Sequence, residues 1–140
     1  MKYKLILVTI VIGSLVACTK QNASPTTALM ETIDSLPITG MKGNFINGPY
    51  GTVSGNAFIT VSNNEKKLVL EKLISSNGPD LHVYLSKELN PVNFIDLGKL
   101  KSVNGTQTYV IASSVAISDY KYALIHCQQF NHLFGSANLQ

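Results

Sequence analysis

Residues 52–61 have the sequence Thr-Val-Ser-Gly-Asn-Ala-Phe-Ile-Thr-Val, and this stretch decides the fold class. From Val53 to Val61 every second residue is apolar or glycine, and most of the residues between them are polar. A period of two places these sets on opposite faces of a half-buried strand. The polar run 62–65 indicates a turn into a second strand over residues 67–74. The sequence therefore predicts a β-hairpin here.

The remainder of the chain has the same character. Turn-forming residues separate further candidate strands, and Asn104-Gly105 is typical of a tight hairpin. One helical turn is expected around residues 113–118. We expect an all-β fold, an antiparallel sandwich or barrel-like single domain of about seven to eight short strands around one core. The further strands are predicted at residues 81–86, 95–100, 106–112, 120–130 and 134–139.

Residues 75–80, Ser-Ser-Asn-Gly-Pro-Asp, carry the most concentrated turn signal. Gly78 supplies a permissive backbone, and Pro79 supplies a preset φ. We expect the carboxylate of Asp80 to accept backbone N–H bonds and thereby hold the turn. These three residues are therefore interpreted as structural rather than catalytic.

The N-terminal residues have the pattern of a bacterial lipoprotein signal. Lys2 and Lys4 precede an apolar run over residues 5–16, and Cys18 follows the small residue Ala17. This run is too short to cross a hydrocarbon core of ~30 Å as a helix, so a transmembrane helix is the weaker alternative. We expect a signal peptide over residues 1–17 and acylation of the cysteine.

Acylation of Cys18 anchors the chain stably in the lipid bilayer. The polar, aperiodic residues that follow predict a flexible tether over residues 18–36, and the folded domain is expected over residues 37–140. The predicted location is a bacterial cell envelope, facing either the periplasm or the cell surface.

The charge pattern argues against nucleic acid as a partner. The chain has a formal charge of +3 and no arginine. Without residues 1–17, nine lysines and eight acidic residues remain, a difference of +1. Only Lys66 and Lys67 are adjacent, so no phosphate-binding stripe is present.

Cys127 is the only cysteine left once Cys18 is acylated, so it has no partner for an intramolecular disulfide. In a strand, Ala123, Ile125 and Cys127 share one face and His126 lies on the other. One interpretation makes Cys127 a small apolar core residue. The other makes it a redox thiol, which requires access and a nearby positive charge. A position near a strand end is compatible with partial exposure.

The histidines are the other candidate ligands. His82, His126 and His132, together with Cys127, are donors that suit copper or zinc. No spacing matches a metal motif or covalent haem attachment, so no metal site is predicted. His82 and Tyr84 occupy the more polar face of their strand, so surface residues are the simpler interpretation.

Catalytic constellations are absent from the sequence. There is no Gly-x-Ser-x-Gly, phosphate-binding loop or His-Glu-x-x-His, and no pair of carboxylates at a suggestive spacing. We therefore do not expect a hydrolase, and a stand-alone enzyme is not favoured.

Five segments in this order resemble the DM13 domain: residues 51–55, 77–85, 97–100, 105–109 and 127–135. The resemblance covers residues 40–140. It implies an all-β, extracellular or periplasmic domain that transfers electrons through a cysteine, either as a bare thiol or as the ligand of a prosthetic group such as haem. The family cysteine falls on Cys127, its Gly-Pro-Asp on residues 78–80 and its terminal Phe-Gly on Phe134-Gly135. Members commonly have tryptophan before the cysteine, where this chain has His126.

Two functions are compatible with these observations. The first is a membrane-anchored redox module that uses Cys127, with His126, His82 and His132 as candidate cofactor ligands and a redox protein of the envelope as its partner. The second is a non-catalytic binding or interaction domain of the envelope, in which Cys127 only fills the core.

Overall fold

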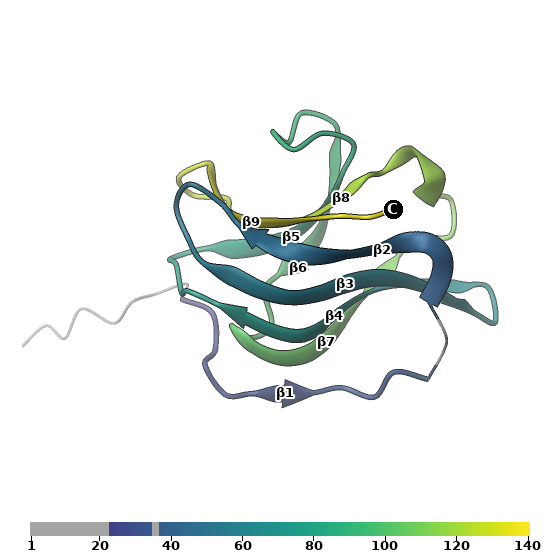
Figure 1. Cartoon of the computed structure of the whole chain (residues 1–140), viewed down its shortest axis with the longest axis horizontal. Coiled ribbons are helices and arrows are strands. Elements are labelled where there is room, and N and C mark those ends of the chain that lie inside the picture. The colour runs from purple at the N-terminus through teal and green to yellow at the C-terminus, as the bar shows by residue number, and fades with distance from the viewer. Residues whose placement is uncertain (1–22, 35–36) are drawn as a thin grey trace, which may run out of the picture.

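The computed structural model describes residues 23–34 and 37–140 of the chain (Figure 1). The expected signal peptide over residues 1–17 and the acylation site Cys18 lie outside these residues. Within the described residues, no helix is long and apolar enough to cross a membrane.

The described residues form an all-β domain, as predicted, with one 3₁₀ turn at Ile117–Asp119. The strands number nine rather than the expected seven or eight. They are β1 (Leu29–Met30), β2 (Pro37–Asn47), β3 (Val53–Ser62), β4 (Glu65–Ser75), β5 (Leu81–Ser86), β6 (Phe94–Lys99), β7 (Asn104–Ile111), β8 (Tyr122–Cys127) and β9 (His132–Asn138).

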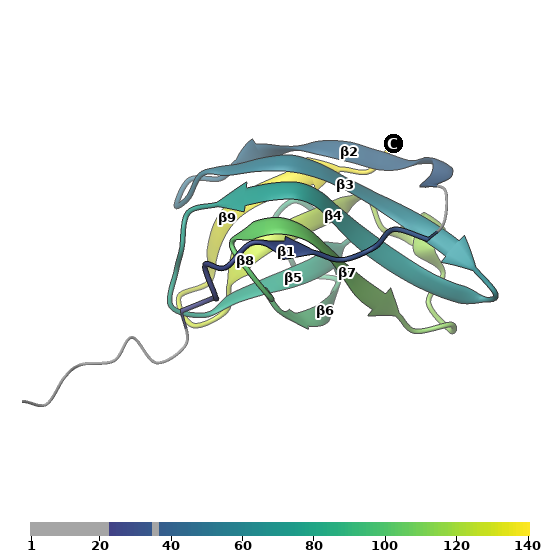
Figure 2. The same cartoon turned by 90° about the horizontal axis from the view of Figure 1, so that it is seen from below.

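All nine strands belong to one sheet in the order β1-β7-β4-β3-β2-β9-β8-β5-β6. Every pairing is antiparallel except that of β1 with β7, so the sheet is mixed. Strand β2 pairs with β3 on one side and with β9 on the other, and it joins the two halves. Figure 2 shows the sheet curled on itself, so that β5 and β6 lie below β3 and β4 in that view. The result is a half-barrel with β1 and β6 as its edges.

The core fills the inside of this curl. Alternation along β3 and β5 sends Val53, Ala57, Ile59, Leu81 and Val83 inward, where all of them are buried. The predicted hairpin of β3 and β4 is confirmed, and a register shift at Gly55, whose φ is +114°, produces a bulge in it.

The hairpin expected at Asn104-Gly105 is wrong. Both residues lie inside β7, which pairs with β4 and β1 rather than with β6. The signal is explained by Gly105, which has a φ of +108° and carries the backbone contact with Leu29 of β1. Asn104-Gly105 thus lets β1 approach β7 closely, and it does not form a turn.

Residues 24–31 do not behave as the free tether that we expected over residues 18–36. The N–H of Ser24 donates to the amide oxygen of Asn77, the Asn77 amide donates to the carbonyl oxygen of Ser24, and β1 pairs with β7. The hydroxyl of Ser102 donates to the carbonyl oxygens of Pro25 and Thr27, at 3.0 and 2.7 Å. The polar composition of this segment therefore serves hydrogen bonding to the domain.

Glu31 completes the docking of this segment and makes it sensitive to pH. Its carboxylate accepts hydrogen bonds from Lys101 and from the amide and hydroxyl of Thr108, each at 2.8 Å. Burial opposes the charge, but these bonds outweigh it and hold the pKa of Glu31 below its usual value. A depressed pKa stabilises the fold above the unfolded pKa, and this stability is lost as the pH falls through the folded pKa.

We therefore predict that Glu31→Gln lowers the free energy of unfolding by about 1 kcal/mol at pH 7, given the partial exposure of this ion pair. The difference between the variant and the wild type should shrink as the pH falls below 4. Urea unfolding of both proteins between pH 7 and pH 3 measures it. A difference that stays constant over this range would contradict the assignment.

Candidate functional site

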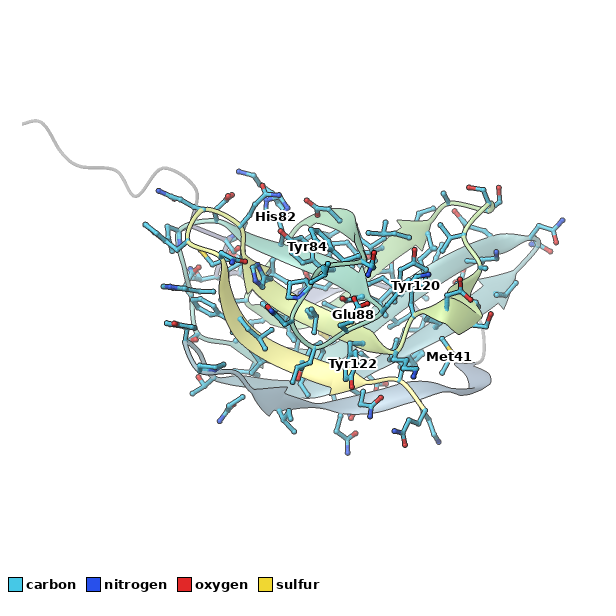
Figure 3. The ribbon with its side chains drawn as sticks, turned by 90° about the horizontal axis from the view of Figure 1, so that it is seen from above. Met41, His82, Tyr84, Glu88, Tyr120 and Tyr122 are labelled. Atoms are coloured by element: carbon cyan, nitrogen blue, oxygen red, sulfur yellow. The ribbon has the colours of Figure 1, made fainter. Side chains whose placement is uncertain are left out.

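The outer face of β5, β6 and β8 carries a cluster of polar and aromatic side chains that the core does not use. His82 and His126 are directly opposite each other in the β5–β8 pair, so both side chains stand on this face. Figure 3 shows His82 and Tyr84 next to each other there. Both were compatible with surface positions on the sequence, but only 7% of His82 and 2% of Tyr84 is exposed. The surface interpretation is therefore wrong.

His82 lies between two carboxylates. Its Nδ1 is 2.8 and 3.0 Å from the two oxygens of Asp96 on β6. Its Nε2 lies 3.4 Å from Oδ1 of Asp80 but does not make a hydrogen bond with it. The same oxygen is 3.4 Å from Nζ of Lys99. The imidazole is thus oriented by Asp96, with Nε2 left facing the cluster.

Tyr84 is held between two rings. Its ring stacks on Phe94 at a centroid distance of 4.3 Å and on His126 at 5.1 Å. Burial, with smaller contributions from the negative charges of Asp96 and Asp80, raises the pKa of Tyr84, although a hydrogen bond with Gln128 acts against it. The phenol therefore stays protonated at neutral pH.

His126 is 4% exposed, and its Nδ1 has no hydrogen-bond partner. Burial lowers the pKa of His126, and the nearby His132 and His82 contribute in the same direction. A neutral imidazole with an available lone pair therefore lies beside Tyr84.

Cys127 lies on the opposite side of the sheet from this cluster. Its side chain belongs to the apolar core together with Ala123 and Ile125, as the alternation in β8 predicts. It is a free thiol with 1% of its surface exposed, so the partial exposure that a strand end would allow is not found. The residue is the last of β8, yet the pairings of Cys127 with Leu81 and His132 keep it covered.

The ring of His132 contacts other aromatic residues than the rings of His82 and His126 do. It stacks on Tyr50 at 3.6 Å with an interplanar angle of 3°, and Phe130 lies 6.0 Å from it. Its Cα is paired with that of Cys127 across β8 and β9, but its ring belongs to this separate aromatic group. The structure therefore places His82 and His126 opposite each other in one strand pair, whereas the ring of His132 stacks on Tyr50, although His132 is near enough to lower the pKa of His126.

A haem ligated by Cys127 does not fit this geometry. The sulfur is surrounded by close-packed apolar side chains, which leave no space for a planar macrocycle. His82 and His126 are nearly as buried. Within the described residues, no three His, Cys, Asp or Glu side chains are grouped so that they could hold a metal ion.

The predicted turn is present at Pro79 and Asp80, but a different side chain holds it. The amide oxygen of Asn77 accepts the N–H of Gly78 at 2.8 Å. The Asp80 carboxylate instead faces His82 and Lys99. The side chain of Asp80 therefore belongs to the cluster, whereas its backbone lies in the turn.

Sequence reasoning did not find Asp96, Phe94 and Gln128, which complete this cluster. They come from β6 and from the end of β8, and only the sheet order brings them next to β5. The one local signal was the alternation of His82 and Tyr84 along a single strand face.

Fold and site together define an all-β domain with a buried thiol on one side of a strand pair and an imidazole–phenol cluster on the other. The family model described as electron transfer DM13 matches residues 44–139, and the chain belongs to this family. No curated protein and no solved structure matches the chain.

The burial of Cys127 predicts that its thiol is protected in the native state. A small alkylating reagent at pH 8 should modify it only as fast as the domain unfolds, which mass spectrometry can follow. Cys127→Ser should destabilise the fold by about 1–3 kcal/mol, because a hydroxyl without a partner replaces the thiol in the core. Rapid alkylation under native conditions would contradict the burial.

Proposed function

We propose that this protein is an electron-transfer module, tethered to a bacterial envelope membrane through acylated Cys18, in which Cys127 is a bare redox thiol. The description of the DM13 family supports electron transfer. The lysines, apolar run and cysteine at the N-terminus support the lipid anchor.

Burial of Cys127 restricts the form that this redox chemistry takes. Thiol–disulfide exchange needs direct attack by a thiolate, and the core gives no partner access to this sulfur. Electron exchange over a distance has no such requirement. In this step the thiol loses one electron to an oxidised redox protein of the envelope, the S–H bond breaks and the proton is released to solvent. One electron from a reduced redox protein, together with a proton from solvent, then restores the thiol.

The observation that carries the proposal is the stack of rings that leads toward Cys127. Phe94, which is 40% exposed, stacks on the buried Tyr84, and Tyr84 stacks on His126. His126 directly precedes Cys127 in the chain. Conjugated rings in contact therefore connect the protein surface to the residue next to the thiol.

Photo-oxidation by a one-electron oxidant tests this proposal. We expect the full chain in detergent micelles to reduce a photo-oxidised ruthenium complex, with a sulfur-centred radical visible by electron paramagnetic resonance. Cys127→Ala should abolish that radical, and Tyr84→Leu should slow the reaction. Tyr50→Leu removes an exposed tyrosine outside the stack and is the matched control.

A second candidate function is favoured by the packing of Cys127 among core residues. In this case the domain is a non-catalytic interaction module of the envelope, and the thiol only fills space. Cys127→Ala would then leave the yield and identity of the photo-oxidised species unchanged. That result would overturn the redox role of the thiol.

A further inference from the structure

Two buried imidazole nitrogens stand out in the described part of the chain. Among its buried side-chain nitrogen and oxygen atoms, only Nε2 of His82 and Nδ1 of His126 have no hydrogen-bond partner. A buried polar atom without a partner destabilises the folded state, because it has lost its hydrogen bond with water. A ligand that accepts lone pairs from both nitrogens would remove this destabilisation.

The two rings are neighbours. His82 and His126 are directly opposite in the antiparallel β5–β8 pair, a position in which β-carbons lie about 5 Å apart. Both rings also lie against Tyr84, with centroid distances of 6.2 Å for His82 and 5.1 Å for His126. At this spacing of the β-carbons, two imidazoles can reach one small ion.

Asp96 orients the His82 ring so that its Nε2 can bind such an ion. Its carboxylate accepts a hydrogen bond from Nδ1 at 2.8 Å, so Nε2 is the ring nitrogen left for a metal ion. A carboxylate on the other ring nitrogen is the usual support of a metal-binding histidine. The charge of Asp80, 3.4 Å from Nε2, also favours a cation at this position.

The number of donor side chains at the site determines which metal ion fits it. Zinc requires four ligands and calcium six or more, whereas the described residues contain no group of three His, Cys, Asp or Glu side chains arranged to hold a metal ion. Imidazole suits copper, and Cu(I) is stable with only two nitrogen ligands. We propose that His82 and His126 bind one copper ion as Cu(I), through Nε2 and Nδ1. This rests on the proposed electron-transfer function, to which it adds a centre that gives one electron to an oxidised partner protein as Cu(I) becomes Cu(II).

The test is anaerobic titration of the full chain, in detergent micelles, with Cu(I) in competition with a coloured Cu(I) chelator. We expect one Cu(I) per chain, and His82→Gln and His126→Gln should each abolish this binding. Asp96→Asn should weaken it about 10–100-fold, as the loss of a supporting carboxylate does. His132→Gln removes the third histidine, which stacks on Tyr50 elsewhere, and should bind as the wild type does.

Two measurements keep the result interpretable. Thermal unfolding shows whether each variant is folded, and Asp96→Asn tests the site through a partly exposed side chain that the core does not need. X-ray absorption at the copper edge should show nitrogen ligands only. A copper–sulfur signal, or binding that Cys127→Ser abolishes, would place the ion at the thiol and overturn the proposal. So would equal binding by the wild type and His82→Gln.

Failure of this inference can be told apart from failure of the proposed function. If the chain binds no copper but still forms the radical at Cys127, the proposed metal site is wrong and the proposed redox thiol stands. If the chain binds copper at the histidines but forms no such radical, the proposed metal site stands and the proposed redox role of the thiol is wrong.

Discussion

The pairing of β5 with β8 is the constraint on which the rest of the structure depends. Six consecutive residue pairs, from Leu81 with Cys127 to Ser86 with Tyr122, hold one register. A slip by one residue would exchange the two faces completely. The register sends the thiol and its apolar neighbours into the core, and it aligns the imidazoles of His82 and His126 on the other side. Packing and candidate chemistry thus follow from the same hydrogen bonds.

Both faces of this strand pair are buried, and this limited what the sequence could predict. Alternation correctly separated the core face of Cys127 from the face of His126. It could not reveal that the polar face of β5 is covered, because the cover comes from Phe94 on the neighbouring edge strand. Period-two patterns identify which residues share a face, whereas burial of the second face depends on tertiary neighbours.

The fold class was predictable, but two strands were not. The regular alternation of β3 and the turn at Pro79 are local signals, and both are confirmed. Strand β2 was missed because glycines interrupt its pattern, yet Gly43 is required where the backbone of Asn138 approaches it. Strand β1 was missed because its two residues are too few to show an alternating pattern. Its pairing with β7 also depends on contacts of Glu31 with residues far along the chain.

The docking of Ser24 against Asn77 also has a consequence for the orientation of the whole domain. Five residues separate Cys18 from Ser24, and a linker of this length spans at most about 20 Å when fully extended. An acyl anchor on Cys18 would therefore hold the end of the half-barrel that carries the 75–80 turn close to the bilayer. Asp80 and His82 lie at that end. A redox partner embedded in the same membrane would then meet the cluster without a diffusional search through the envelope.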